Sequence, residues 1–336
     1  MSKPMTTSSS RPLDAGPSPE MQNLLQRIAR AGRPALWDLG VEQARQAYAA
    51  SSDVLDIPPP KLTEVLDLDC EARDGVRLRV RRYRNDVERS TAGEPLPALL
   101  YLHGGGFVIG SVETHDILCR QLALYAGCAV FALDYRLAPE YPFPTAVNDA
   151  WDALVWLREN GPMLGVDPQS IAIGGDSAGG TLATVGAITA RDEGWRLPLQ
   201  LLFYPGTAGW AQTASTLHYG HGYLLEREHL DWFFGRYLPD PAQRNDWRFA
   251  PMFAPDLRDV APAWMGLAGC DLLHDEGVLY AERLRHAGVP VTLREWPGVT
   301  HDFIRMGRAL PQAGQAIRSA ADALLQAFSG ASAKAA

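Results

Sequence analysis

Long apolar runs are missing from this 336-residue sequence, and its first twenty residues hold no apolar stretch typical of an export signal. A membrane-spanning helix needs about 20 predominantly apolar residues, and a secretory signal needs an apolar core of roughly 7–15 residues. Because neither pattern occurs, we expect no membrane span and no secretory signal. We therefore expect a cytoplasmic protein.

Cysteine is scarce, and its four residues form no C-x-x-C pair. Each one lies in or beside an apolar segment: Cys70, Cys119, Cys128 and Cys270. Free cysteines in such surroundings behave as small buried hydrophobes, so we expect reduced thiols rather than a disulfide framework. This agrees with a cytoplasmic location, where disulfides are rare.

An excess of positive charge is also missing, because 31 lysines and arginines face 39 acidic residues, for a net charge of −8. Nucleic-acid-binding domains carry basic patches, so we expect no nucleic-acid partner. No G-x-x-x-x-G-K-[ST] phosphate loop is present. The His218–His221 pair has no convincing third ligand at a metal-site spacing, so we expect neither a metal nor an organic cofactor.

Short apolar runs separated by helix-like stretches make up most of the chain. Seven runs predict strands, at residues 77–83, 97–104, 128–135, 170–175, 199–205, 263–269 and 291–298. Most are nearly continuous in apolar residues, as in parallel strands covered on both faces. Helices are predicted between them, at residues 113–127, 145–160, 178–194, 275–288 and 312–328. The alternation predicts an α/β fold with a mainly parallel central sheet.

Two segments interrupt this alternation. Residues 18–50 predict one or two amphipathic helices before the first strand, and residues 206–250 are rich in aromatic residues with polar loops between them. Long segments of this kind in a compact domain are usually functional. We therefore divide the chain into a catalytic core at 56–205 and 251–330 and a helical cap region at 1–55 and 206–250.

A serine surrounded by glycines follows the strand at 170–175. Gly175, Ser177 and Gly179 form a G-x-S-x-G between a predicted strand and a predicted helix, which is the context of a nucleophile elbow. The glycines remove the Cβ atoms that would clash in so tight a turn. The alternative is a glycine-rich turn that binds phosphate at a helix N-terminus, and the negative charge of Asp176 argues against it.

A second glycine cluster, His103 to Gly106, ends the strand at 97–104. Acyl transfer creates an oxyanion that needs preorganised N–H donors, and an HGGG loop supplies them in lipases and esterases. We expect those donors to be the backbone N–H groups of Gly104, Gly105, Gly106 and Ala178. The alternative, a G-x-G-x-x-G dinucleotide loop, is disfavoured because the next glycine follows only at position 110.

The acid and the base should follow the serine in the order Asp or Glu, then His. Asp271 lies just past the strand at 263–269, and His301 lies just past the strand at 291–298. We expect His301 to act as general base toward Ser177 and Asp271 to orient it. Other histidines lie on predicted helices or their caps and are expected to be solvated: His115, His274 and His286.

Five stretches together resemble the hormone-sensitive-lipase-like carboxylesterases, bacterial family IV of the α/β hydrolases. They are HGGGF (103–107), DYRLAPE (134–140), GDSAGG (175–180), DLLHDEG (271–277) and HDF (301–303). The resemblance covers roughly residues 60–325. One departure is Asp271-Leu272-Leu273, where the family usually has Asp-Pro-Leu.

The resemblance implies an α/β-hydrolase fold, with a mainly parallel sheet of about eight strands flanked by helices and covered by a helical cap. It implies that Ser177, Asp271 and His301 form a catalytic triad and that residues 134–140 support the oxyanion loop. It also implies short to medium acyl chains rather than long-chain fats.

We therefore predict a carboxylic-ester hydrolase that works through a covalent acyl-enzyme on small-molecule esters. Candidate substrate-binding residues are Phe107, Asp176, Trp210, Tyr219 and Phe234. Two alternatives stay open: a small-molecule receptor of the same fold without catalysis, and a deacetylase, lactonase or amidase that uses the same triad. A homodimer also stays open.

Overall fold

A central sheet of eight strands forms the core of the computed structural model, which describes residues 16–85 and 95–335. The strands lie in the order β1-β2-β4-β3-β5-β6-β7-β8. Their bounds are β1 (Glu64–Glu71), β2 (Arg77–Arg84), β3 (Leu96–Leu102), β4 (Ala129–Leu133), β5 (Val166–Asp176), β6 (Gln200–Phe203), β7 (Ala263–Ala268) and β8 (Val291–Trp296). The pairs β1–β2 and β2–β4 are antiparallel, and all other neighbours are parallel.

All seven predicted strands are present, and the mainly parallel α/β sheet is confirmed. The eighth strand, β1, was not among the runs predicted from the sequence. It is an edge strand whose residues are mostly exposed or half-buried. It therefore lacks the continuous apolar run by which the covered strands are recognised.

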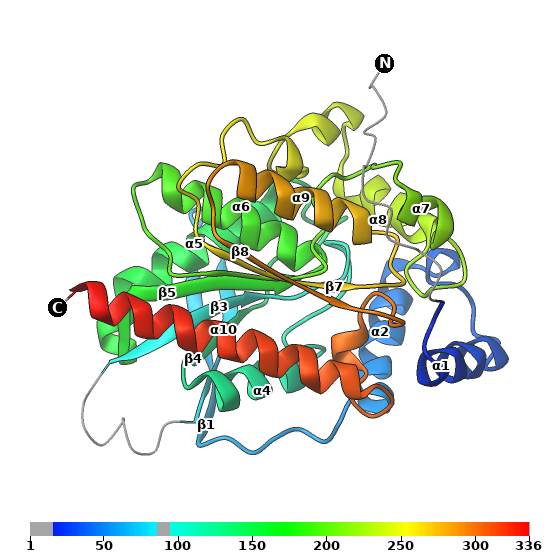
Figure 1. Ribbon diagram of the computed structural model, residues 1–336, viewed down its shortest axis with the longest axis horizontal. Helices are drawn as coiled ribbons and strands as arrows, with labels where there is room; N and C mark the ends of the chain where they lie inside the picture. The colour runs from blue at the N-terminus through cyan, green and yellow to red at the C-terminus, as the bar shows by residue number, and fades with distance from the viewer. Residues whose placement is uncertain (1–15, 86–94, 336) are drawn as a thin grey trace.

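Helices cover both faces of the sheet (Figure 1). On one face lie α5 (Thr145–Asn160), α6 (Ala178–Asp192) and α9 (His274–His286), and on the other lie α4 (Asp116–Ala126) and α10 (Pro311–Ala335). Successive side chains of a strand point to opposite faces, so β3 contributes Leu100 and Leu102 to one core and Leu99 and Tyr101 to the other. This double burial makes the strands rigid supports for the residues at their ends.

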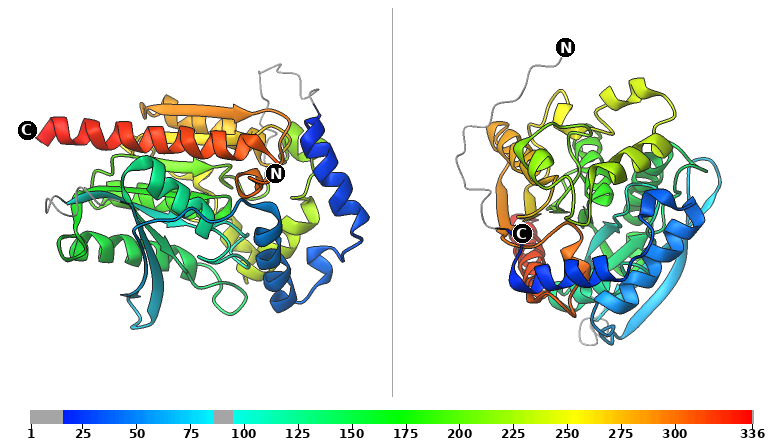
Figure 2. Two further views of the ribbon diagram at one scale, coloured as in Figure 1. Left: turned by 90° about the horizontal axis from the view of Figure 1, so that it is seen from below. Right: turned by 90° about the vertical axis from the view of Figure 1, so that its right-hand side faces the viewer.

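Two segments distant in sequence lie together at the end of the sheet where the parallel strands finish (Figures 1 and 2). We call residues 16–55 and 206–250 the cap segments; residues 1–15 of the predicted cap lie outside the described residues. They contain α1 (Pro19–Arg30), η1 (Leu36–Asp38), α2 (Val41–Leu55), α7 (Ala214–His218), α8 (Arg227–Tyr237) and η3 (Pro241–Asn245). Three further short helices lie in the core: η2 (Gly161–Leu164), η4 (Pro251–Phe253) and η5 (Phe303–Arg305).

The two cap segments contact each other through aromatic rings. The Trp37 ring of η1 meets the His229 ring of α8 edge-on, with 4.6 Å between centroids. Burial lowers the pKa of His229 to about 4, so this imidazole is neutral at physiological pH.

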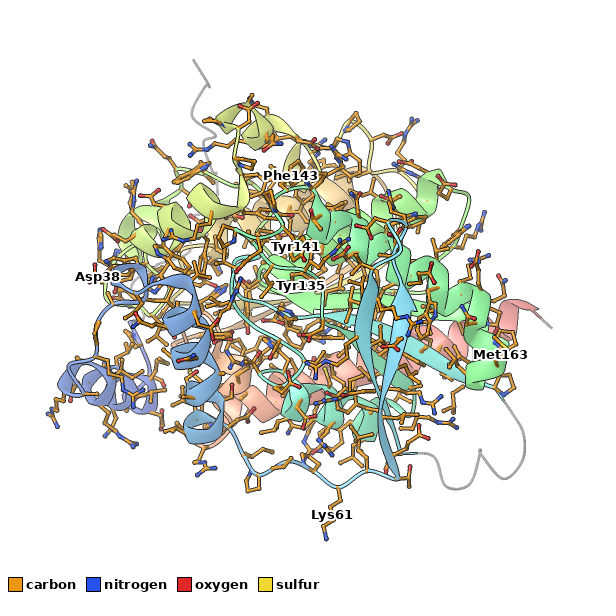
Figure 3. All side chains as sticks on the ribbon, turned by 180° about the vertical axis from the view of Figure 1, so that it is seen from behind. Asp38, Lys61, Tyr135, Tyr141, Phe143 and Met163 are labelled. Carbon is orange, nitrogen blue, oxygen red and sulfur yellow. The ribbon has the colours of Figure 1, made fainter. Side chains whose placement is uncertain are left out.

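Figure 3 shows Asp38 of η1 at the opposite end of the molecule from Met163 of η2, which precedes β5.

Two further expectations concern the cysteines and membrane-spanning helices. All four cysteines are buried and none of them forms a disulfide, as expected. Within residues 16–85 and 95–335, no helix combines the length and apolar character that crossing a membrane requires.

Candidate active site

The backbone turns sharply at Ser177, between the end of β5 and the start of α6. Ser177 has φ 53° and ψ −121°, a positive φ that is strained for a residue with a side chain. Its N–H donates to the carbonyl of Phe203 on the neighbouring strand β6 at 2.9 Å. A Cβ atom on Gly179 would overlap the Leu102 carbonyl oxygen, and one on Gly175 would lie 2.5 Å from it. Both glycines are therefore required by the close crossing of strand and helix.

Ser177, His301 and Asp271 form one hydrogen-bonded chain. His301 Nε2 lies 2.9 Å from Ser177 Oγ, and His301 Nδ1 lies 2.6 Å from Asp271 Oδ2. The other oxygen of Asp271 accepts the N–H of Leu273 at 2.9 Å, which fixes the carboxylate plane. Because Asp271 accepts from Nδ1–H, Nε2 of the neutral ring is free to accept the serine proton.

Electrostatics favour the charged form of this imidazole. Burial lowers the pKa of His301, but the neighbouring Asp271 carboxylate outweighs it, so the pKa is raised above its ordinary value. Both side chains are buried, with His301 6% and Asp271 1% exposed. The pair can therefore stabilise an imidazolium away from bulk water.

The loop that carries His301 is held by Arg305, which is only 3% exposed. Its guanidinium lies 4.1 Å from the centroid of the Tyr48 ring of α2 and pairs with Asp302 at 2.7 Å. Arg305 Nε also donates to the carbonyl of Thr114 at 3.0 Å. One buried cation thus connects a cap helix, the His301 loop and the segment before α4.

The backbone N–H groups of the glycine loop after β3 differ in whether they already have a hydrogen-bond acceptor. Gly105 has a φ of 119° and Gly106 has a φ of 58°. Glycine adopts such positive values readily because it has no Cβ atom. Among the described residues, nothing accepts from the N–H groups of Gly105, Gly106 or Ala178. The N–H of Gly104, by contrast, donates to Asp176 Oδ1 at 3.1 Å. The expectation that Gly104 is an oxyanion donor is therefore wrong, because a buried carboxylate already occupies its N–H.

Residues 134–140 lie against this loop, where the resemblance placed them. The Tyr135 ring stacks on His103 at 4.2 Å, and its hydroxyl donates to the His103 carbonyl at 2.7 Å. The N–H of Ala138 donates to the carbonyl of Phe107 at 2.9 Å. Burial lowers the pKa of His103 to about 4, so its ring is neutral and donates from Nδ1 to the Gly104 carbonyl.

Asp176 lies beneath the oxyanion loop rather than in a substrate pocket. It is 1% exposed, and its carboxylate also accepts the Tyr101 hydroxyl at 2.8 Å and meets His115 Nε2 at 3.2 Å. Its prediction as a substrate-binding residue is wrong, because these partners use its polar atoms inside the core. The solvated position expected for His115 is also wrong, since His115 is 1% exposed. The Asp176–His115 pair instead joins the nucleophile turn to the loop that it faces.

A cavity opens beside Ser177. Its wall is mostly apolar and includes two of the predicted substrate-binding residues, Phe107 and Phe234. It is lined by Gly106, Phe107, Ser177, Ala178, Thr181, Gly206, Gly209, Leu225, Leu230, Phe233, Phe234, Phe249, Leu273 and Glu276. Cap and core side chains thus build the wall together.

Two other predicted substrate-binding residues lie elsewhere. Trp210 lines a neighbouring cavity, and the centroid of its ring lies 5.3 Å from that of Phe234. Tyr219 is 1% exposed and packs in a small core with Cys270, Leu272 and Leu273, behind the Asp271 loop. The prediction for Tyr219 is wrong, because its aromatic ring supports the loop instead of facing the cavity.

Several wall residues were missed from the sequence. Leu225, Leu230 and Phe233 come from the cap segment, and Leu273 and Glu276 follow Asp271. The aromatic run around Phe233 pointed to the right segment, but it did not show which ring faces the site. Nothing in the local sequence distinguishes Glu276 from an ordinary solvated glutamate at a helix start.

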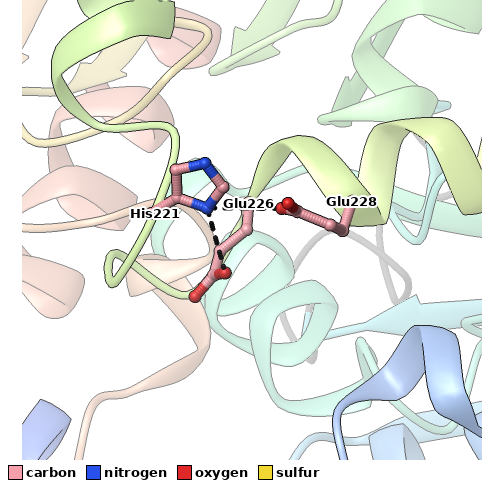
Figure 4. A group of neighbouring side chains, drawn as sticks. All are labelled: His221, Glu226 and Glu228. Atoms are coloured by element: carbon pink, nitrogen blue, oxygen red, sulfur yellow. Dashed lines mark ion pairs between the residues drawn. The ribbon is translucent and has the colours of Figure 1, made fainter.

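One surface cluster joins an imidazole to two carboxylates (Figure 4). His221 Nδ1 lies 3.8 Å from Glu226 Oε2 and 3.4 Å from Glu228 Oε2, and the side chain of His221 is 66% exposed. Sequence reasoning found no third group near the His218–His221 pair, yet Glu226 and Glu228 lie close to His221 in space. The cluster lies at the start of α8, where Glu226 also accepts from the N–H of Gly222.

His274 is a further correction among the histidines. It was expected to be solvated, but its side chain is 14% exposed and lies between Asp275 at 3.2 Å and Glu295 at 3.0 Å. Burial lowers the pKa of His274, yet the two carboxylates outweigh it and raise the pKa to about 9. This imidazolium ties α9 to β8 and lies outside the cavity wall.

A mainly parallel sheet with a serine elbow, followed in the chain by Asp and His at later strand ends, is the arrangement of the α/β hydrolases. A family model described as "alpha/beta hydrolase fold" matches residues 99–305. The chain is 43% identical over 317 residues to an ethyl acetate hydrolase of Pseudomonas putida, covering 92% of this chain and 98% of the relative.

Solved structures agree. An ester hydrolase from the metagenome of Lake Arreo, in complex with a bipyridine phosphonate derivative, has a TM-score of 0.89 and 39% identity over 93% of this chain and 99% of its own. A hyperthermophilic esterase from Pyrobaculum calidifontis has a TM-score of 0.86 and 38% identity over 93% and 98%. The chain belongs to the α/β-hydrolase superfamily, among the hormone-sensitive-lipase-like serine carboxylesterases.

Proposed function

We propose that this carboxylesterase hydrolyses short- to medium-chain esters through a covalent acyl-enzyme on Ser177. The observation that carries the proposal is the chain from Ser177 Oγ to His301 at 2.9 Å and on to Asp271 at 2.6 Å, beside a cavity. The reacting serine is thus the one at the strained turn between β5 and α6. A serine with a purely structural role would not need both the strained backbone and the hydrogen bond to a buried imidazole.

The first half-reaction forms the acyl-enzyme. Ser177 Oγ attacks the ester carbonyl carbon while His301 Nε2 takes the serine proton, and Asp271 stabilises the imidazolium. The carbonyl oxygen becomes an oxyanion that accepts the N–H groups of Gly105, Gly106 and Ala178. The bond between the acyl carbon and the alkoxy oxygen then breaks, and His301 gives its proton to that oxygen, so the alcohol leaves.

Water completes the cycle. His301 takes a proton from the water as it attacks the acyl carbon, and the second oxyanion forms in the same hole. When this intermediate collapses, the bond to Ser177 Oγ breaks and the serine regains its proton from His301. The carboxylic acid leaves, and the enzyme returns to its starting state.

We also propose that the cap segments close the pocket over the substrate chain. The supporting contacts are the cap residues Leu225, Leu230 and Phe233, whose apolar side chains lie in the wall of the cavity beside Ser177. Apolar walls of this kind are typical of small-molecule pockets. The name of the P. putida relative, an ethyl acetate hydrolase, is in line with a short substrate.

The test is Ser177→Ala with p-nitrophenyl butyrate as substrate. Removing the nucleophile of a serine hydrolase lowers kcat by about 10⁶-fold. Labelling by a fluorophosphonate checks the same serine independently and should vanish in the variant. Activity near the wild-type rate in Ser177→Ala would overturn the mechanism, and activity that keeps rising beyond about ten acyl carbons would overturn the confined pocket.

A further inference from the structure

A single acidic side chain lines the wall between the two cavities. Glu276 of α9 lines both the cavity beside Ser177 and the outer cavity that holds Trp210. Its side chain is buried, with 3% of the residue exposed. The other residues shared by the two cavities are Gly209, Leu230 and Leu273, so the junction is otherwise apolar. The triad and the oxyanion hole make no use of this carboxyl group.

The two oxygens of this carboxyl group have different surroundings. Oε1 accepts the backbone N–H groups of Thr207 at 2.5 Å and Ala208 at 3.1 Å, which pins the side chain to the segment after β6. The Thr207 hydroxyl donates to the Glu276 backbone carbonyl at 3.2 Å and lies close enough to the carboxyl group to lower its pKa. Within the described residues, no donor lies at hydrogen-bond distance and geometry from Oε2. Oε2 thus keeps hydrogen-bonding capacity for a group of a bound chain.

Both protonation states of Glu276 are populated near neutral pH. Burial raises the pKa of Glu276 to about 7, against the two backbone N–H groups, which lower it. The negative charge of Asp271, on the loop after β7, raises it further. A group with this pKa changes its charge in the range where esterases are assayed.

Other charged groups surround this carboxyl group at the junction. From α8, Arg227 and Asp231 line the outer cavity with opposite charges. On α9 itself, His274 is paired with Glu295 and Asp275 accepts from Ser215, so both already have partners. The segment after β6 contributes only uncharged groups to the contact.

We propose that Glu276 is a specificity-determining residue, which favours acyl chains that carry a hydroxyl group over alkyl chains of the same shape. The proposal rests on the function proposed above, since it assumes that the acyl chain enters this cavity. A hydroxyl group can donate to Oε2, whereas a methyl group at the same place strips Oε2 of water without replacing its hydrogen bond. A charged chain is disfavoured in the cavity beside Ser177, because the other residues of that wall are mostly apolar and carry no charge.

The preference should grow with pH. Below pH 7 the protonated carboxyl group is neutral, and an alkyl chain covers it at a modest cost. Above pH 7 the carboxylate is costly to cover but binds a hydroxyl donor more strongly than a neutral acceptor does. The ratio of kcat/KM for a hydroxylated ester to that for its methyl counterpart should therefore rise from pH 6 to pH 8.

The experiment measures this ratio for two matched pairs of esters. Ethyl 3-hydroxybutyrate is compared with ethyl 3-methylbutyrate, and methyl 6-hydroxyhexanoate is compared with methyl heptanoate. Each pair exchanges a hydroxyl for a methyl group, at a short and at a longer reach. In the wild-type enzyme, we expect at least one of the two ratios to rise by about five- to tenfold from pH 6 to pH 8. This factor corresponds to the difference in strength between a hydrogen bond to a charged acceptor and one to a neutral acceptor.

Glu276→Gln keeps an oxygen for Thr207 and Ala208 and replaces the ionisable oxygen by an amide. In this variant, the ratio of kcat/KM for the hydroxylated ester to that for its methyl counterpart should not change with pH. Glu282→Gln, at an exposed position of the same helix, is the control, and its ratio should rise with pH as in the wild type. If Glu276→Gln does not fold, Glu276→Asp withdraws the carboxyl group by one methylene and should weaken the preference.

Wild-type ratios that stay constant with pH, or a Glu276→Gln ratio that still rises, would overturn the inference. Because ionisation of His301 affects both esters of a pair alike, it cancels in the ratio. Failure of this inference would leave ester hydrolysis and its dependence on Ser177 intact. Failure of the proposed function would instead appear as hydrolysis of all four esters that survives Ser177→Ala.

Discussion

The core and the cap segments contribute to the same cavity in different ways. The core places Ser177, Asp271 and His301 at strand ends, where backbone geometry and buried partners determine each position. The cap segments contribute wall side chains such as Leu230 and Phe233, which no backbone constraint of that kind selects. The comparison teaches that the groups we propose for the chemistry depend on precise placement, whereas the walls depend on size and shape.

The largest effect after loss of the nucleophile is expected for Asp271→Asn. An asparagine leaves the imidazole without its negative partner and with the wrong tautomer, so kcat for p-nitrophenyl butyrate should fall by about 10⁴-fold. The raised pKa of His301 places the acid limb of the wild-type pH profile above the ordinary histidine value of 6.5. Without the carboxylate, burial remains and should move the residual acid limb to lower pH.

Asp275→Asn is the matched control, since Asp275 lies close to Asp271 in sequence but accepts from the N–H of Ser215 rather than from His301. We expect it to change kcat by less than tenfold. An Asp271→Asn enzyme within tenfold of the wild type would show that another group orients His301.

A second prediction concerns stability at the core side of the site. Asp176→Asn leaves the Gly104 N–H, Tyr101 hydroxyl and His115 with one acceptor oxygen in place of a carboxylate. Breaking a buried pair in this way costs about 3–5 kcal/mol, so the free energy of unfolding in urea should fall by that amount at pH 7.

The pH dependence of this effect has a definite sign. Burial raises the pKa of Asp176, but His115 and the other partners outweigh it and hold the pKa below its ordinary value of 3.8. The stabilisation is therefore complete above about pH 4 and is lost as the pH falls through the lower, folded-state pKa. Asp69→Asn, at a side chain 69% exposed, should change the free energy of unfolding by less than about 0.5 kcal/mol. Equal losses in the two variants would contradict the role of the buried network.

The smallest effect is expected on the cap side, for Phe233→Leu. This ring lies against Gly106, where an added Cβ atom would overlap it, and it forms part of the cavity wall. A smaller side chain enlarges the pocket, so the preferred acyl chain should become longer, while kcat/KM for the butyrate ester changes by about tenfold or less. A kinetic panel of p-nitrophenyl esters from acetate to decanoate measures the shift.

Phe253→Leu provides the comparison, because Phe253 is 54% exposed and does not line the cavity. Its chain-length profile should match that of the wild type. If Phe233→Leu leaves the profile unchanged while Phe253→Leu alters it, the cap segment is not the wall that we assign.

Sequence patterns predicted the strands that carry apolar residues in a regular pattern. Most of the seven recognised strands are buried, although β8 at the other edge of the sheet is only half-buried or exposed, whereas the edge strand β1, with one buried residue, was not recognised. The positions of Asp271 and His301 followed from chain order, and the structure brings both within hydrogen-bond distance of their partners. Their catalytic roles stay predictions that the substitutions above test.

Polar side chains next to the site were predicted less well. Aspartate is mostly exposed in proteins and histidine is intermediate in burial, and only the mutual contact of Asp176 and His115 inside the fold reveals that both are buried. The same holds for Gly104, whose N–H is occupied by a carboxylate 72 positions further along the chain. Contacts of such long range leave no local pattern in a single sequence.

By itself, the sequence determined the order of seven strands and of the helices between them, the glycine-dependent turn at Ser177 and the loop at Gly105 and Gly106, because each rests on local backbone geometry or on a local pattern of apolar residues. The tertiary structure alone decided which glycine N–H is already occupied and which aromatic rings line the cavity. It also decided that Glu276 is buried at the junction of two cavities. The physical reason is that burial and pairing of a side chain depend on elements far apart in the chain, which meet only when the sheet and the cap segments have assembled.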